Sequence, residues 1–78
     1  MTISESVAEV FTLELNVPSE EIRPSLKYGE IPEWDSNSHM VLITALEERF
    51  GIEFDSDEIV EMTSVEAITS ALEAKGAA

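Results

Sequence analysis

Apolar residues recur at helical spacing near the start of the chain. The stripe consists of Ile3, Val7, Val10 and Phe11. Residues three and four apart share one face of a helix, so the pattern predicts a helix over 4–15. Asn16 and Pro18 then supply signals that end it.

The clearest predicted helix covers 36–50. Asp35 is a favourable N-cap and Gly51 a C-terminal stop. One side of the helical wheel carries His39, Leu42, Ile43, Leu46 and Phe50. The other side carries Asn37, Met40, Val41, Thr44 and Glu48. Ser36 lies between the two faces, in the first turn.

Two further helices are expected towards the C-terminus. A short one should cover 56–61, opened by Asp55. The last should cover 64–74, because Thr63 and Glu66 have the spacing of a capping box and Gly76 can end it. Its apolar stripe is Val65, Ile68 and Leu72.

The connection over 17–34 contains three prolines and one glycine, which rule out a continuous helix. It also carries the apolar residues Ile22, Leu26, Tyr28 and Ile31. We therefore expect a loop that packs onto the body of the protein. The fold class predicted is all-α: a small four-helix bundle with three longer helices and one short one, forming a single domain over 1–78.

Charge narrows the range of partners. Seventeen acidic residues face four basic ones, for a formal net charge of −13. Such a chain is unsuited to nucleic acid, whose phosphates require Lys and Arg, and its partners should carry basic patches. The N-terminus has no basic segment followed by an apolar run, and no stretch is long enough to span a bilayer. We expect a cytoplasmic monomer.

Ser36 is the residue best suited to chemistry. With Asp35 as the cap, the helix does not need the serine hydroxyl, and a phosphate-linked group there would meet the positive end of the helix dipole. The Asp35-Ser36 pair alone is more often an ordinary helix start. A longer pattern is needed to assign a function.

That longer pattern resembles the acyl carrier proteins. Asp35-Ser36 stands in the first two places of their Asp-Ser-Leu motif. The similarity continues, at the family's spacing, in three further segments: Ala45-Leu46-Glu47-Glu48-Arg49-Phe50, Gly51-Ile52-Glu53-Phe54 and Met62-Thr63-Ser64-Val65. It covers nearly the whole chain.

The resemblance implies a carrier rather than an enzyme. A phosphopantetheinyl transferase would move phosphopantetheine from coenzyme A to Ser36, next to the motif residue Asp35. The arm would supply the thiol that this cysteine-free chain lacks, and would hold acyl groups as thioesters. Acyl-loading and acyl-processing enzymes of fatty-acid, polyketide or related biosynthesis would dock through basic patches onto Glu47 and Glu48.

The sequence also departs from the family. Asn37 stands where leucine is usual, Val41 where glutamate is frequent, and Trp34 where a small residue is common. Met40 and Val41, apolar on an exposed face beside Ser36, suggest a docking patch shared with Asn37. These departures favour a discrete carrier that serves one dedicated pathway.

Three other functions have some support in the sequence. An acidic helical docking module without a prosthetic group would share size, charge and fold. A nucleophilic pair of Ser36 and His39 would also need an orienting acid and an oxyanion site. A calcium loop starting at Asp55 is disfavoured because Ile59 and Val60 stand where a ligand and a glycine are required. No metal site is expected.

Overall fold

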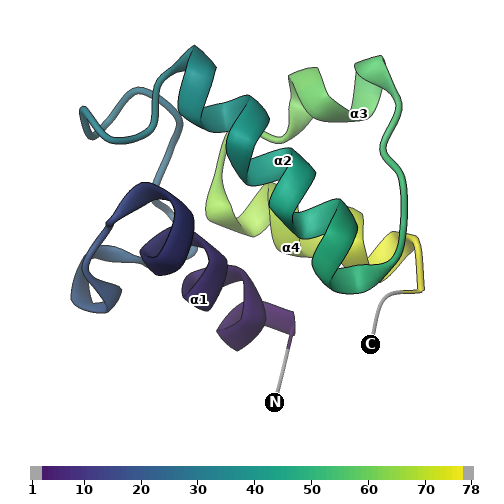
Figure 1. The fold of residues 1–78 in the computed structure, drawn as a ribbon, viewed down its shortest axis with the longest axis horizontal. Coiled ribbons are helices and arrows are strands. Elements are labelled where there is room, and N and C mark those ends of the chain that lie inside the picture. Colours follow the sequence, from purple (N-terminus) through teal and green to yellow (C-terminus); the bar gives the residue numbers. More distant parts are fainter. Residues whose placement is uncertain (1–2, 77–78) are drawn as a thin grey trace.

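The computed structural model describes residues 3–76 and contains helices without a named strand in that range (Figure 1). The elements are α1 (Ile3–Leu15), the 3₁₀ helix η1 (Ser19–Glu21), α2 (Ser36–Phe50), α3 (Ser56–Glu61) and α4 (Val65–Ala74). The all-α fold with three longer helices and one short helix is confirmed. Residues 1–2 and 77–78 of the predicted domain lie outside the described residues.

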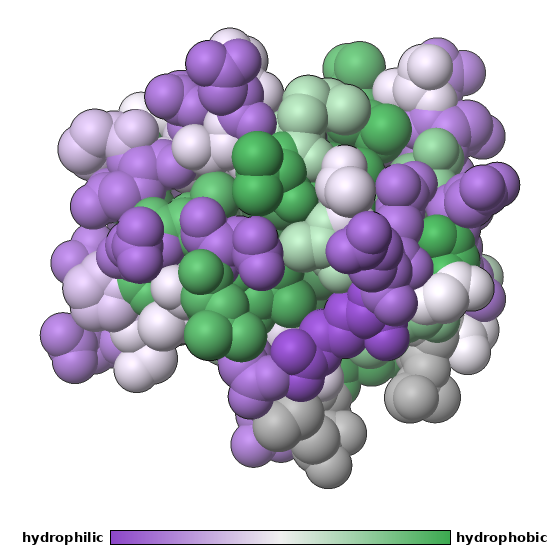
Figure 2. All heavy atoms as spheres, viewed as in Figure 1, coloured by the Kyte–Doolittle hydropathy of each residue, from purple (hydrophilic) through white to green (hydrophobic). Residues whose placement is uncertain are grey.

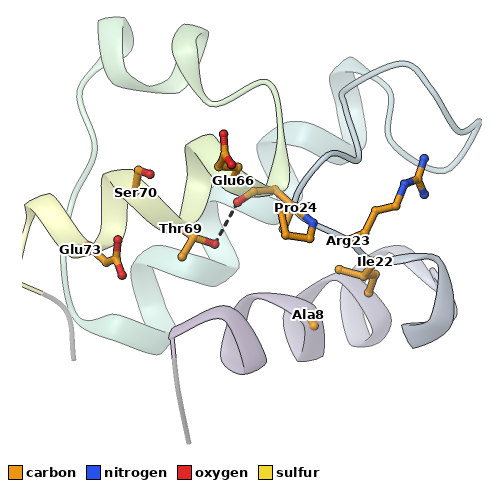
Figure 3. Close-up of a pocket in the computed structure, with 9 residues that line it drawn as sticks. Ala8, Ile22, Arg23, Pro24, Glu66, Thr69, Ser70 and Glu73 are labelled. Carbon is orange, nitrogen blue, oxygen red and sulfur yellow. Dashed lines mark hydrogen bonds between the residues drawn. The ribbon is translucent and has the colours of Figure 1, made fainter.

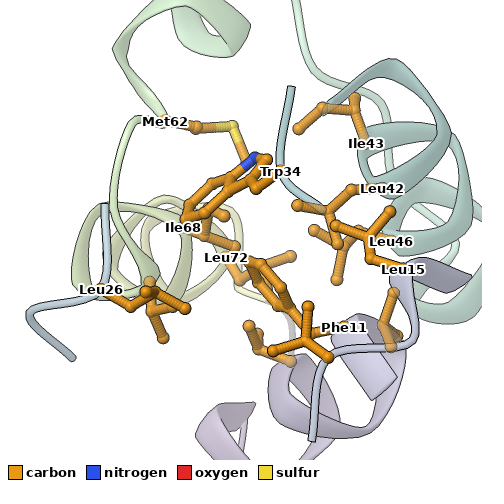
Figure 4. Close-up of a cluster of buried hydrophobic side chains, with 14 of the residues drawn as sticks. Phe11, Leu15, Leu26, Trp34, Leu42, Ile43, Leu46, Met62, Ile68 and Leu72 are labelled. Atoms are coloured by element: carbon orange, nitrogen blue, oxygen red, sulfur yellow. The ribbon is translucent and has the colours of Figure 1, made fainter. Parts of the chain in front are cut away.

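The core forms where α1, α2 and α4 pack together, with residues from the loops between helices (Figure 4). Its fully buried large side chains include Phe11, Leu26, Trp34, Leu42, Leu46, Met62, Ile68 and Leu72. Each such side chain contributes about 1.5–3 kcal/mol by leaving water. By contrast, α3 contains no buried residue and lies across the molecule from α1 (Figure 1).

The predicted caps of α2 and α3 are confirmed. The Asp35 carboxylate accepts the backbone N–H of Ser38 at 2.9 Å, and Gly51 ends α2 in the left-handed region at φ 66°. At the start of α3, Asp55 and Glu58 form a reciprocal capping box. These caps satisfy N–H groups that the first turn of a helix leaves without partners.

The predicted capping box of α4 is wrong. The N-cap is Ser64, whose hydroxyl accepts the backbone N–H of Ala67 at 3.0 Å, rather than Thr63 paired with Glu66. Backbone contacts with the preceding loop explain the shift. The carbonyl of Thr63 accepts the N–H of Tyr28 at 2.8 Å, and the N–H of Glu66 donates to the carbonyl of Pro24 at 3.0 Å.

The long connection packs onto the body, as predicted. Leu26 and Trp34 are fully buried, and the N–H of Val65 donates to the carbonyl of Leu26 at 3.0 Å. Lys27 and Ser64 form an isolated antiparallel bridge. These bonds attach the middle of the connection to the start of α4. The short helix η1 was not predicted.

Candidate functional site

Ser36 is the first residue of α2, and its side chain is exposed. Asp35 directly before it is also exposed and caps the helix. The backbone N–H of Ser38, together with the Ser38 hydroxyl, holds the pKa of Asp35 below its ordinary value. Ser36 thus presents an exposed hydroxyl beside a carboxylate that stays ionised at neutral pH.

A groove of about 320 Å³ adjoins Ser36, between α2 and α3. Besides Ser36 it is lined by Tyr28, His39, Met40, Ile59, Val60 and Thr63. Three large side chains on its walls remain exposed: Met40 by 51%, Val60 by 73% and Tyr28 by 40%. The groove residues from the loop and α3 were not identified from the sequence, because they lie far from Ser36 along the chain.

His39 lines this groove and is half-buried. Its Nδ1 accepts the indole N–H of Trp34 at 3.0 Å, and its Nε2 lies 3.2 Å from the carbonyl oxygen of Ile59. Both ring nitrogens are therefore engaged in packing contacts. This arrangement fits a structural histidine and leaves no ring nitrogen to activate Ser36.

The exposed side of α2 presents the predicted docking residues. Asn37, Met40, Val41 and Glu48 are exposed there. Met40, Val41 and Glu48 line a second groove, of about 350 Å³, with Glu14 of α1. Figure 2 shows apolar atoms at the centre of the face that α2 crosses, bordered by hydrophilic ones. Met40 belongs to both grooves and so connects this surface to the surroundings of Ser36.

Glu47 has a different environment from Glu48. Its side chain is half-buried, and the carboxylate accepts the backbone N–H of Phe54 at 2.8 Å. Its own carbonyl accepts the N–H groups of Gly51 and Ile52. Glu47 thus fixes the turn that leads from α2 to α3. This role could not be predicted from the sequence, because the path of the turn between Glu47 and Phe54 is not encoded in a recognisable pattern.

Within residues 3–76, basic side chains form ion pairs with carboxylates. Arg23 pairs with Glu30 at 3.7 Å, Arg49 with Glu9, and Lys75 with Glu58 at 2.9 Å. Arg49 follows Glu48 in sequence but reaches across to α1. Glu48 itself is exposed on α2.

Metal and membrane features can be described for residues 3–76. Over that range no three His, Asp or Glu side chains are grouped so as to hold a metal ion. No helix within the same range is long and apolar enough to cross a membrane. Asp55 and Glu58, at the segment that partly resembles a calcium loop, are engaged in the capping box of α3.

A third groove, of about 300 Å³, lies between α1, the long loop and α4 (Figure 3). Its lining includes Ala8, Ile22, Pro24, Glu66 and Glu73. It shares no residue with the groove beside Ser36. None of the site residues predicted from the sequence lines it.

The surroundings of Ser36 fit a covalently attached phosphopantetheine. A phosphodiester formed there would lie at the N-terminal end of α2, where backbone N–H groups and the helix dipole favour negative charge. Beside it, the groove offers apolar surface to the arm or its cargo. The exposed hydroxyl is accessible to a modifying enzyme.

Comparison with known proteins supports phosphopantetheine as the group that this chain carries. The family model described as phosphopantetheine attachment site matches residues 5–72. An acyl carrier protein of Nitratidesulfovibrio vulgaris (strain DSM 19637 / Miyazaki F) is 33% identical over 66 residues, covering 85% of this chain and 87% of that protein. One of Solidesulfovibrio magneticus is 31% identical over 75 residues, covering 96% of each. The chain therefore belongs to the family of phosphopantetheine-carrying domains that includes the acyl carrier proteins.

Proposed function

We propose that this protein carries acyl groups as thioesters on a phosphopantetheine arm attached to Ser36. The observation that carries the proposal is the exposed Ser36 hydroxyl at the capped start of α2, within the matched 5–72 segment and beside an apolar groove. The arm supplies a thiol, which this cysteine-free chain lacks. The chain itself catalyses no reaction and presents its cargo to other enzymes.

Attachment requires a phosphopantetheinyl transferase. The Ser36 oxygen forms a bond to the phosphorus of coenzyme A that bears the pantetheine. The phosphoanhydride bond breaks, the adenosine bisphosphate half departs, and the hydroxyl proton passes to a base on the transferase. Asp35 supports this step by fixing the helix start, since its carboxylate binds the N–H of Ser38.

Partner enzymes dock on the exposed side of α2. Asn37, Met40 and Val41 supply polar and apolar contacts, while Glu48 faces basic residues of the partner. Glu47 adds charge to this surface but is partly committed to Phe54. The partners are the transferase and the acyl-loading and acyl-processing enzymes of one dedicated pathway, in fatty-acid, polyketide or related biosynthesis. The protein acts as a cytoplasmic monomer.

The test is intact-mass spectrometry after incubation with coenzyme A and a broad-specificity transferase. One phosphopantetheine should be added to the wild-type protein and to Ser38→Ala, and none to Ser36→Ala. Absence of modification in the folded wild-type protein would instead favour an acidic docking module without a prosthetic group.

A further inference from the structure

Two hydrogen-bonded rings form the floor of the groove beside Ser36. The imidazole of His39 lines the groove and lies beside the indole of Trp34, with centroids 6.0 Å apart and an interplanar angle of 27°. The indole is fully buried and meets Phe11 of α1 edge-on at 4.8 Å. Trp34 therefore occupies the interior beneath the groove, among the core side chains (Figure 4).

Hydrogen bonds hold these two rings, the Trp34–His39 floor of the groove, in place. Trp34 donates to His39 at 3.0 Å, and His39 contacts the carbonyl oxygen of Ile59 at 3.2 Å, so the imidazole bridges α2 and α3. A chain entering the core would have to separate these groups and displace a closely packed indole. Dense interiors resist such insertion, and a buried N–H left without an acceptor is destabilising.

Apolar surface is available outside this floor. The walls contributed by Met40 and Val60 are exposed by 51% and 73%, so a ligand covering them would remove apolar area from water. The groove volume of about 320 Å³ is at the low end for small-molecule sites, roughly 300–1,000 Å³. Such a space suits a short chain better than a long one.

We propose that the cargo of this carrier is a short apolar acyl chain, held in the surface groove between α2 and α3 above the Trp34–His39 floor and excluded from the core. The inference rests on the proposed attachment at Ser36. It adds the class of acyl group and assigns Trp34 and His39 as the residues that limit its length.

The experiment uses full-length protein loaded from butyryl-, octanoyl- or palmitoyl-coenzyme A by a broad-specificity transferase, with loading verified by intact mass. Its readouts are the melting temperature and the fluorescence of Trp34, the single tryptophan. The melting temperature should rise by about 2–4 °C from butyryl to octanoyl and no further with palmitoyl. Emission and iodide quenching of Trp34 should be the same in all three forms.

Two matched variants test whether the groove causes the rise in melting temperature. Val60→Ser removes an apolar side chain from the groove wall at an exposed position. It should abolish at least half of the rise in melting temperature from the butyryl to the octanoyl form. Leu13→Ser makes the same kind of change on α1, at a side chain that is 67% exposed and outside the groove. This variant should keep the full rise in melting temperature. Equal losses in both variants would contradict the groove assignment.

Different outcomes would overturn this inference and the proposed function. If palmitoyl stabilises the loaded protein beyond octanoyl and alters Trp34 emission, the chain enters the core and the inference is overturned. A loaded protein whose melting temperature is independent of chain length also overturns it. In both cases attachment at Ser36 stands, whereas the absence of any added mass overturns the proposed function and this inference together.

Discussion

The indole N–H of Trp34 donates to Nδ1 of His39 across 3.0 Å. Because Nδ1 accepts this bond, the imidazole carries its proton on Nε2, which then donates to the carbonyl of Ile59. The loop before α2, α2 itself and α3 are joined through this one histidine. The relationship predicts energetic coupling between Trp34 and His39.

Removing either partner should be destabilising, and removing both should cost less than the sum. His39→Leu leaves the buried indole N–H without its acceptor, which should lower the free energy of unfolding by about 1–3 kcal/mol. Trp34→Phe keeps an aromatic ring but loses the donor. The double variant should be more stable than additivity predicts by about 1 kcal/mol, measured by urea denaturation. Additive effects, within about 0.3 kcal/mol, would show that the pair is not coupled.

The neighbouring acids Glu47 and Glu48 should differ in their effect on stability. Glu47→Ala removes the acceptor of the Phe54 N–H and should reduce the free energy of unfolding by about 1–2 kcal/mol. Glu48→Ala changes an exposed side chain and should stay within about 0.5 kcal/mol of wild type. Chemical denaturation of both variants provides the comparison, and equal stabilities would disprove the structural role of Glu47.

Glu48 should instead affect partner recognition. Glu48→Lys should slow transfer to a partner enzyme with a basic docking patch several-fold at low salt, mainly through the association rate, with the difference shrinking as salt is added. The matched control is Glu73→Lys on α4, which changes net charge equally but lies outside the α2 surface. If both reversals slow transfer equally, net charge rather than this surface is responsible.

Acid should destabilise the fold because it protonates two carboxylates, Asp35 and Glu58, whose pKa values are lowered in the folded protein. The N–H of Ser38 lowers the pKa of Asp35 below 3.8, and the N–H of Asp55, aided by Lys75, lowers the pKa of Glu58 below 4.5. In the unfolded chain both groups bind protons more tightly. Their stabilising effect is therefore complete above those ordinary values and is lost as the pH falls through the lowered ones.

Asp35→Asn isolates one of these contributions. Asparagine caps helices about as well as aspartate but does not titrate. The variant should melt close to the wild type at neutral pH and lose less stability below about pH 4. Thermal melts between pH 7 and pH 2 measure the two curves. Parallel curves would mean that Asp35 does not contribute to acid unfolding.

Local signals were sufficient to predict most helices. Asp35 and Gly51 bound α2 at both ends, and the buried positions Leu42, Ile43 and Leu46 follow from their spacing. The predicted cap of α4 was wrong because contacts between the loop and the helix, far apart in sequence, decide whether Thr63 or Ser64 is the cap.

The site was only partly predictable. Ser36, as the exposed start of α2, follows from the pattern around it. The contact of His39 with Ile59 joins residues twenty positions apart, and the burial of Trp34 depends on how the loop folds back. Trp34 looked like a departure from the family at the attachment motif, whereas the structure makes it part of the core.

The most direct test of this account is the mass of the protein after exposure to coenzyme A and a broad-specificity transferase. The account predicts a single added phosphopantetheine, located by fragmentation on Ser36, with Ser36→Ala unmodified and still folded by circular dichroism. Modification of Ser36→Ala, or of another residue in the wild-type protein, would contradict it.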